Sequence, residues 1–575
     1  MKVLLIATAY NSLTQRVHTE LAALGHDVSI ELAVSDEAIA EAVALYQPDL
    51  IIAPMLKSAI PEQIWRNHVC IIIHPGIKGD RGPSSLDWAI ANDEEEWGVT
   101  ALQAEAEMDA GSIWSSFNFK MRRARKSSLY RHEVTEAAIS AILQTLDRFQ
   151  TKDFVPEPLD CSKPDIKGSL RPLMKQEIRA IDWSEPTTNI LRKIHAADSC
   201  PGVLDTIYGE KYYLYGAHEE DNLKGAPGEI VAQCNGAICC TTGDGAIWIS
   251  HLKKKNTASQ SFFKLPAAMV LGDRLKDVPE YRIDLEIPAT RKTYREIWYE
   301  QENSVGYLHF EFYNGAMSTE QCNRLKEAFI FARHQKTKAI VLMGGADFWS
   351  NGINLNTIEA AENPADESWR NINAMNDLIY EIITTDTKLL IAALEGNAGA
   401  GGVMLALAAD LVFARTGAIL NPHYKGMGNL YGSEYWTYLL PKRVGEKKAL
   451  ELTNDCLPIG TQVAKEIGLI DNYFGDRLLS FRQRIVILAE AIASSPDYEQ
   501  KLARKNTTRL LDEQIRPLAD YRAEELERMK ANFYAPDRSY HIARANFVYK
   551  VSPRATPLHL AKHRSLVTSS LNVYG

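Results

Sequence analysis

Short apolar segments alternate with amphipathic segments over residues 1–150 of the chain. The apolar segments are rich in Val and Ile and are typical of buried strands, whereas the segments between them have helical periodicity. Such alternation predicts a parallel, doubly wound α/β sheet, with ligands at the carboxyl ends of its strands. No G-x-G-x-x-G motif follows the first strand, which argues against a dinucleotide-binding fold. The expected strands are 2–8, 26–32, 49–54 and 69–75, and the expected helices are 13–25 and 36–47.

This pattern changes twice further along the chain. A Pro-rich stretch at 154–168 predicts a linker, and short alternating segments between Gly-containing turns then predict a small antiparallel β-barrel. Strand and helix alternate again over 300–475, where 402–415 is almost wholly apolar and is predicted as one long buried helix. We therefore expect a doubly wound α/β domain, a β-barrel (OB-like) domain, a second α/β domain and a helical C-terminal region, at 1–160, 165–285, 295–480 and 481–575.

Length and composition limit the class of protein. With 575 residues, 46% hydrophobic and 24% charged, the chain has the balance of a multidomain globular protein. Its net charge of −9 argues against a nucleic-acid partner, and no apolar stretch reaches the roughly 18 residues of a membrane span. The 8 cysteines form no C-x-x-C pair, which fits reduced thiols in the cytoplasm. The 14 histidines show no metal-ligand spacing, so we expect no metal site.

A histidine ends the last apolar strand of the first domain, in the segment IIIHPGIKGDRGPSSLDWAI. His74 is followed 35 residues later by Asp109, which lies in the segment MDAG. A histidine donates and accepts protons near neutral pH, and a carboxylate can orient its ring or a water molecule. On their own, however, such residues are more often a histidine bonded to a backbone carbonyl and an aspartate that caps a turn.

The surrounding residues resemble the folate-dependent formyltransferases. His74–Pro75, Gly82–Pro83, Trp88–Ile90, Gly98–Thr100 and Asp109–Gly111 match the motifs of that family in order. Residues 179–197 and 236–252 are similar to the C-terminal barrel of methionyl-tRNA formyltransferase. The resemblance covers residues 1–285 and implies that His74 and Asp109 are catalytic. It also implies a site for 10-formyltetrahydrofolate formed by the loops after the first and third strands, with Gln15, Arg16, Met55, Leu56 and Ile60, and by the loop that contains Asp109.

One position departs from the formyltransferase pattern. The asparagine that the family has two residues before its histidine is Ile72 in this chain. Loss of an oxyanion donor typically lowers the rate by about 10²–10³-fold. We therefore expect an acceptor or a chemistry that differs from the usual formylation of an amine. The acidic balance of the chain also argues against tRNA as the acceptor.

Two glycine-containing turns follow apolar strands in the second α/β domain, at 348–355 and 395–410. Gly-rich turns can offer backbone N–H groups to a developing oxyanion, although they more often serve close packing. The pair of turns resembles the crotonase (enoyl-CoA hydratase/isomerase) superfamily over 300–475. This resemblance implies that an acyl-CoA thioester is bound, with Gly352 in the CoA-binding turn and Ile353 and Gly401 as the oxyanion-hole amides.

The crotonase-like segment also departs from its family. The two positions that hold the catalytic glutamates of hydratases are Met404 and Tyr424, so hydration of a double bond is not expected. Tyr424 and Glu434 remain in the segment NPHYKGMGNLYGSEYW. They can form a proton-transferring pair if burial raises the pKa of the glutamate. The alternative, with about equal weight, is that Tyr424 packs as an aromatic and Glu434 is an ordinary surface or capping residue.

The combination of domains, including residues 549–564, resembles the HypX (HoxX) family of hydrogenase maturation proteins. The resemblance implies a bifunctional enzyme with two small-molecule substrates, 10-formyltetrahydrofolate and CoA. A formyltransferase would load CoA, and a lyase would decarbonylate formyl-CoA to CO and CoA, supplying the CO ligand of [NiFe]-hydrogenases. Other maturation proteins are the implied partners, and neither nucleic acid nor a membrane is expected. The alternatives are hydrolysis of formyl-CoA to formate, formylation of another acceptor, and a non-catalytic assembly scaffold.

Overall fold

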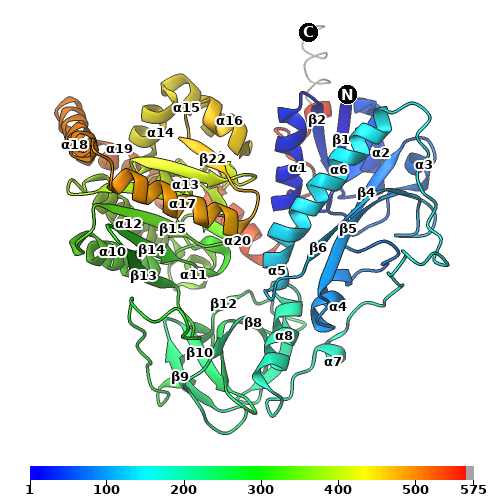
Figure 1. The fold of residues 1–575 in the computed structure, drawn as a ribbon, viewed down its shortest axis with the longest axis horizontal. Coiled ribbons are helices and arrows are strands. Elements are labelled where there is room, and N and C mark those ends of the chain that lie inside the picture. The colour runs from blue at the N-terminus through cyan, green and yellow to red at the C-terminus, as the bar shows by residue number, and fades with distance from the viewer. Residues whose placement is uncertain (565–575) are drawn as a thin grey trace. The chain divides into compact units, whose positions relative to one another are not determined.

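The computed structural model describes residues 1–564. The chain forms two compact units (Figure 1). Each unit is made of segments that are not continuous in sequence. Unit 1 contains residues 1–262, 266–280 and the described residues from 552 onward, and unit 2 contains residues 263–265 and 281–551. Across residues 1–564, no helix combines the length and the apolar character that a membrane crossing requires.

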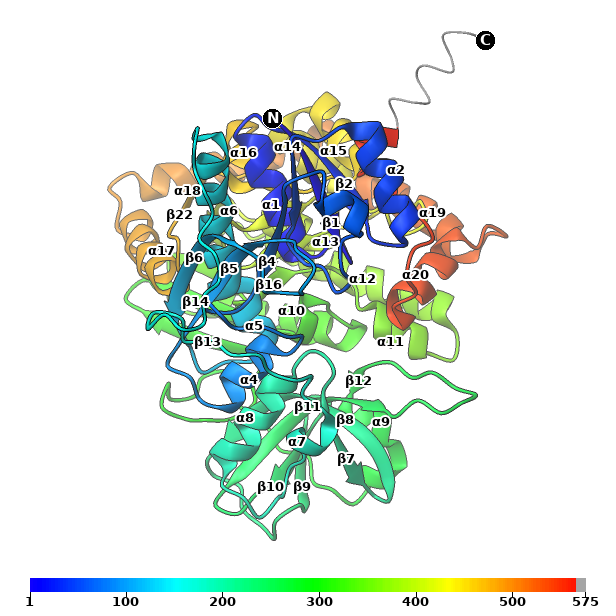
Figure 2. The same ribbon diagram turned by 90° about the vertical axis from the view of Figure 1, so that its right-hand side faces the viewer.

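The N-terminal part of unit 1 is a six-stranded sheet with the order β2-β1-β3-β4-β5-β6 (Figures 1 and 2). The strands β1 to β4 run parallel, which confirms the predicted doubly wound fold, and β5 and β6 extend the sheet antiparallel. Helix α2 packs on β1 and β2, and α6 packs on β5 and β6. The strands are β1 (Lys2–Ala7), β2 (Asp27–Leu32), β3 (Leu50–Ala53), β4 (Cys70–His74), β5 (Glu96–Gln103) and β6 (Ile113–Lys120), and the main helices are α1 (Ser12–Ala23), α2 (Asp36–Tyr46), α4 (Ser85–Ala91) and α6 (Thr135–Gln150).

The second part of unit 1 consists of short antiparallel strands, as the Gly-containing turns predicted. The strand order is β7-β8-β11-β10-β9, and α8 (Thr187–Ala197) packs on β8 (Figure 2). Alternating strand residues and the buried face of α8, including Ile190 and Ile194, form the hydrophobic core of this part. The strands are β7 (Val203–Ile207), β8 (Glu210–Glu220), β9 (Ile230–Cys234), β10 (Ala237–Thr241) and β11 (Ala246–Lys254).

The last described residues of the chain cover the edge strand β2 of unit 1. The backbone N–H of Ile30 donates to the carbonyl of Leu560, at 3.1 Å. Nε2 of His563 lies 2.9 Å from Oε2 of Glu31, and both side chains are fully buried. The Thr556 hydroxyl donates to Oε1 of the same glutamate at 2.8 Å. An edge strand exposes unpaired backbone groups, and this C-terminal segment covers part of that edge.

Replacing Glu31 with alanine is expected to destabilise unit 1 by about 3–5 kcal/mol, because it leaves a buried polar partner uncompensated. The measurement is denaturant unfolding, combined with hydrogen exchange at the amides of Ile30 and Leu32. The matched control is Asp27→Ala, since Asp27 binds Lys562 of the same segment at 3.6 Å with both side chains half exposed. That pair is expected to contribute less than about 1 kcal/mol. Unchanged exchange of Ile30 and Leu32 in Glu31→Ala would contradict this role of the buried pair.

Unit 2 is built on a second six-stranded sheet, with the order β13-β14-β15-β17-β19-β22. The strands from β14 onward are parallel, and α10 (Thr319–His334) and α12 (Pro364–Ile383) contribute many buried side chains to the main core. Ser318 and Gln321 form a capping box at the start of α10, and Asn363 caps α12 immediately before Pro364. The strands are β13 (Ile297–Glu302), β14 (Val305–Phe310), β15 (Ala339–Gly344), β17 (Leu389–Leu394), β19 (Leu411–Arg415) and β22 (Asn472–Phe474).

The prediction of one long helix at 402–415 was wrong. Helix α13 (Gly401–Leu407) ends after two turns, and the following residues form β19. The Asp410 carboxylate accepts a hydrogen bond from the N–H of Leu390 at 2.7 Å, and Leu411 then pairs with Ile391 of β17. A short, continuous apolar run does not distinguish a buried strand from a buried helix by periodicity.

The C-terminal region of unit 2 is helical, as predicted, up to residue 549. Helix α17 packs on β14, β15 and β17, and α19 packs on α12 and α14 (Figure 1). The region expected at 481–575 is nevertheless shared between the two units, because the described residues from 552 onward belong to unit 1. The helices are α14 (Trp436–Val444), α17 (Leu478–Ala493), α18 (Tyr498–Ile515), α19 (Leu518–Tyr534) and α20 (Ser539–Tyr549).

Candidate functional site

His74 is the last residue of β4, at the carboxyl edge of the parallel strands of unit 1. Its side chain is buried, and Nδ1 lies 3.7 Å from Oδ1 of Asp109. Asp109 is held in the loop between β5 and β6, where its other carboxylate oxygen accepts the N–H of Gly82 at 3.2 Å. The fold therefore brings together the two residues that the sequence singled out, at an ion-pair distance rather than a hydrogen-bond distance.

The closest carboxylate to His74 belongs to a residue that the sequence reasoning missed. Oδ2 of Asp80 lies 2.8 Å from Nε2 of His74, and Asp80 is 2% exposed. A Cβ at Gly76 would collide with both side chains, so a larger residue here would displace the His74–Asp80 contact. Asp80 lies in the segment that contains the formyltransferase motifs, six residues after His74, and its position in a glycine-bounded loop was the available signal. The imidazole thus lies between two carboxylates.

Met55, Leu56 and Ile60 lie in the loop after β3, at this same edge of the sheet, whereas Gln15 and Arg16 lie in helix α1 and not in the loop after β1 where they were predicted. The N–H of Thr8 donates to the carbonyl of Met55 at 2.9 Å, so the two loops lie side by side. The Gln15 amide donates to the carbonyl of Tyr10, and Arg16 is buried with Nη2 at 3.1 Å from Glu20. The side chains of Ile60 and Leu56 pack in the hydrophobic core beside β3, as does Ile72 of β4.

Three short parallel strands bring the predicted residues of unit 2 together. The strands β16 (Phe348–Ser350), β18 (Asn397–Gly399) and β20 (Ile419–Asn421) pair side by side, so the residues after each strand meet at one end of the sheet. A Cβ at Gly352 would lie 3.4 Å from the backbone nitrogen of Gly401. The two turns therefore pack directly against one another, with Tyr424 just after the third strand.

The two predicted amides are in position to donate outward. The N–H of Met317 donates to the carbonyl of Gly352, and the carbonyl of Met317 accepts the N–H of Asn354. Ile353 lies between these two residues in a strand-like pairing, so its own N–H points away from Met317. Gly401 opens α13, where a backbone N–H has no intrahelical acceptor. Met404 lies inside the same helix and is fully buried in the core, so this position contributes packing.

Tyr424 and Glu434 form a buried hydrogen-bonded pair. The Tyr424 hydroxyl donates to Oε2 of Glu434 at 2.9 Å, and Glu434 is 1% exposed. A Cβ at Gly401 would collide with Oε1 of Glu434, which places the carboxyl directly against the Gly401 turn. Burial raises the pKa of Glu434 to about 7, although hydrogen bonds from Tyr424 and the Ser433 amide lower it. Burial, followed by the charge of Glu434, raises the pKa of Tyr424 well above its usual value.

Two further residues that support Glu434 were not found by sequence reasoning. Asn376 of α12 accepts the N–H of Glu434 at 2.8 Å, and Glu525 of α19 accepts the N–H of Tyr435 at 2.9 Å. Both are fully buried polar side chains. They lie 58 and 90 residues from the groups that they bind, so no local pattern links them to the site.

Two family models match separate parts of the chain. The model for the formyl transferase C-terminal domain matches residues 173–265, and the model for enoyl-CoA hydratase/isomerase matches residues 300–548. Among curated proteins, the methionyl-tRNA formyltransferase of Trichlorobacter lovleyi is 26% identical over 229 residues, which are 38% of this chain and 71% of that protein.

Two further relatives match along almost the whole chain. The hydrogenase maturation factor HoxX of Bradyrhizobium diazoefficiens is 46% identical over 565 residues, covering 98% of this chain and 97% of that protein. The crystal structure of HypX from Aquifex aeolicus in complex with tetrahydrofolic acid is 49% identical with a TM-score of 0.94, and covers 98% and 99% of the two chains. The chain therefore belongs to the HypX (HoxX) family of hydrogenase maturation factors.

Proposed function

We propose that this chain makes carbon monoxide from a folate-bound formyl group, in two steps. Unit 1 transfers the formyl group of 10-formyltetrahydrofolate to the thiol of CoA, with His74 and Asp109 as catalytic residues. Unit 2 decarbonylates the formyl-CoA to CO and CoA, and the CO becomes a ligand of the [NiFe]-hydrogenase active site. We expect the reaction in the cytoplasm, with other hydrogenase maturation proteins as the partners that receive the CO.

The folate half rests on the edge of the sheet where His74 lies. The loops after β1 and β3 lie at the same edge of the sheet as His74, and the first of them leads into helix α1, which contains Gln15 and Arg16. HypX from Aquifex aeolicus was crystallised in complex with tetrahydrofolic acid, which supports a folate site in this chain as well. Asp80 adds a second carboxylate at the imidazole, so His74 can take the proton of the CoA thiol while the thiolate attacks the formyl carbon. The C–S bond forms, the bond between the formyl carbon and N10 of the folate breaks, and the proton passes from His74 to N10, which gives formyl-CoA and tetrahydrofolate.

The single observation that carries the second step is the buried Glu434 carboxyl between Tyr424 and the Gly401 turn. Formyl-CoA has no α-carbon, so enoyl-CoA chemistry is not available to it. Its C–H bond can break with the proton passing to the Glu434 carboxylate, while the C–S bond breaks and its electron pair leaves with the thiolate. The proton then returns to sulfur, which gives CO and CoA with all atoms accounted for. The amides of Ile353 and Gly401 hold the formyl oxygen during this step.

The test is to supply the purified full-length protein with 10-formyltetrahydrofolate and CoA and to measure CO as carbonylated haemoglobin. We expect CO and tetrahydrofolate in equal amounts. Formate without CO would instead identify a formyl-CoA hydrolase. No turnover of either substrate, together with normal hydrogenase activation by His74 or Tyr424 variants, would identify an assembly scaffold.

The pH dependence of CO release follows from the pKa of Glu434. A catalytic base is active when ionised, so kcat is expected to rise with pH through about 7 and to level off above it. The Tyr424 hydrogen bond lowers that pKa, so Tyr424→Phe is expected to move the inflection to higher pH as well as to lower kcat. The measurement is the pH profile of kcat. Tyr431→Phe removes a hydroxyl from the same segment and serves as the control, and an inflection that stays in place in Tyr424→Phe would contradict the assignment.

A further inference from the structure

The loop that presents Glu434 has a backbone conformation that ordinary residues rarely adopt. Glu434 and Tyr435 both lie in the left-handed region, with φ angles of 64° and 58°. Neither residue is glycine, and two consecutive side chains in this region persist only where surrounding contacts hold them. The conformation directs the Glu434 carboxyl toward Tyr424 and the Gly401 turn.

One face of helix α19 contacts this loop at three residues, Glu525, Met529 and Asn532. The Asn532 side chain accepts the N–H of Tyr431 at 3.0 Å, and Sδ of Met529 accepts the N–H of Gly432 at 3.2 Å. Glu525, seven residues before Asn532 and on the same face, binds the loop immediately after Glu434.

Glu525 makes three hydrogen bonds to the end of the loop. Oε2 accepts the N–H of Tyr435 at 2.9 Å, and Oε1 accepts the N–H of Thr437 at 2.8 Å and the Thr437 hydroxyl at 2.6 Å. Helix α14 begins here, and its N-cap residue makes no side-chain capping bond. The Glu525 carboxyl group, which is distant in sequence, accepts the free N–H groups of this helix start instead. Glu525 is fully buried, and burial raises its pKa to about 8.

Glu434 is therefore fixed by hydrogen bonds at both of its flanking peptide groups. Its own N–H donates to Asn376, and the N–H of the next residue donates to Glu525. These two bonds set the direction of the Cα–Cβ bond between them. The Glu434 carboxyl occupies the space that a Cβ at residue 401 would fill, so it lies against the Gly401 turn as well as against Tyr424.

We propose that Glu525 is a positioning residue for Glu434: it holds residues 434 and 435 in the left-handed conformation and thereby aims the Glu434 carboxyl at the bound thioester. Glu525 acts through the backbone and does not itself touch the substrate. This inference rests on the proposed role of the Tyr424–Glu434 pair.

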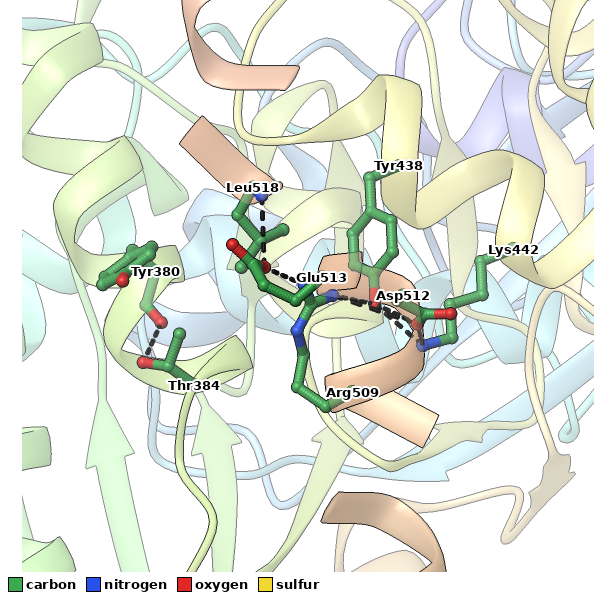
Figure 3. Close-up of polar contacts among 8 residues, drawn as sticks. All are labelled: Tyr380, Thr384, Tyr438, Lys442, Arg509, Asp512, Glu513 and Leu518. Atoms are coloured by element: carbon green, nitrogen blue, oxygen red, sulfur yellow. Dashed lines mark hydrogen bonds and ion pairs between the residues drawn. The ribbon is translucent and has the colours of Figure 1, made fainter. Parts of the chain in front are cut away.

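The competing explanation is that Glu525 only docks α14 onto the C-terminal helices. Helix α14 makes a second polar contact with those helices, which allows the two explanations to be separated. Figure 3 shows the Tyr438 hydroxyl between Lys442 and Asp512, with Arg509 beside it. The Tyr438 hydroxyl donates to the Asp512 carboxylate at 2.7 Å, and Lys442 donates to the same carboxylate oxygen at 2.7 Å. Asp512→Asn therefore weakens the docking of α14 without touching the loop at Glu434.

The experiment compares Glu525→Gln and Asp512→Asn with the wild-type protein, all as full-length chains. Glutamine has the volume of glutamate but presents an NH₂ group to one of the backbone N–H donors, so the loop loses a bond. We expect kcat for CO release to fall by about 10²-fold in Glu525→Gln, the effect of a misplaced catalytic group, with the KM for CoA unchanged. Asp512→Asn is expected to keep wild-type kcat and KM. Crystal structures of both variants give φ at residues 434 and 435, and thermal unfolding confirms that each is folded.

The result expected is a loss of kcat and of the left-handed conformation in Glu525→Gln alone. A folded Glu525→Gln protein with wild-type kcat would overturn the inference, and so would equal losses in both variants, which would indicate docking only. If the wild-type protein releases no CO, the proposed function fails, and the crystal structures still decide the positioning role. A left-handed loop that persists in Glu525→Gln would then overturn it.

Discussion

Replacing His74 with alanine is expected to lower formyl transfer from 10-formyltetrahydrofolate to CoA by about 10²–10⁴-fold, the usual contribution of a general acid–base group. His74 is the titratable group between Asp80 and Asp109 at the end of β4, and neither carboxylate can take over a proton at the position of its ring. The rate of formyl transfer is measured as the release of tetrahydrofolate, which is detected by its absorbance. Binding of CoA to the variant, followed by calorimetry, is expected to be unchanged.

The matched control is His68→Ala. His68 precedes the first residue of β4 by two residues, whereas His74 is the last residue of this strand. The two histidines therefore lie at opposite ends of β4, and removal of His68 is expected to leave the transfer rate unchanged. Asp80→Asn keeps the shape of the site and removes the charge next to Nε2, and we expect an intermediate loss. Formyl transfer at the wild-type rate in a folded His74→Ala protein would remove unit 1 from the proposed reaction.

The strand pattern of the sequence predicted where the candidate residues lie in the sheets, but it did not predict which side chains bind them. His74 was predicted at a strand end, and the parallel strands β1, β3 and β4 do bring the loops after them together. In unit 2, the two glycine turns are adjacent because β16 and β18 are neighbouring parallel strands. Parallel strands end at a common edge, so a local pattern in each segment is sufficient to infer that the ends meet.

Two of the missed residues act across long separations in sequence, whereas Asp80 lies only six residues from His74. Asn376 and Glu525 are polar residues on amphipathic helices, where the sequence alone predicts a solvent-exposed face. They are buried because they accept backbone N–H groups of the Glu434 loop, and a buried acceptor requires such a partner. The error at 402–415 has a different cause, since buried strands and buried helices share the same apolar composition.

Glu434→Gln is expected to separate the two proposed reactions. The substitution keeps the size of the side chain and can keep a hydrogen bond from Tyr424, but an amide does not accept the formyl proton. We expect CO release to fall by about 10²–10⁴-fold, while formyl transfer from folate to CoA continues. Formyl-CoA then accumulates or drains to formate by hydrolysis. The measurement is the ratio of CO, trapped by haemoglobin, to tetrahydrofolate, together with formate in the same sample.

The control for this variant is Glu446→Gln, an exposed glutamate that follows α14 in the same unit. It is expected to give CO and tetrahydrofolate in the wild-type ratio. The outcome depends on where the proton of the formyl group goes, because the carbon and oxygen leave as CO only after that proton is removed. A Glu434→Gln protein that releases CO and tetrahydrofolate in equal amounts at the wild-type rate would show that another group takes the proton. A fall in both products together would place Glu434 in the formyl transfer step instead.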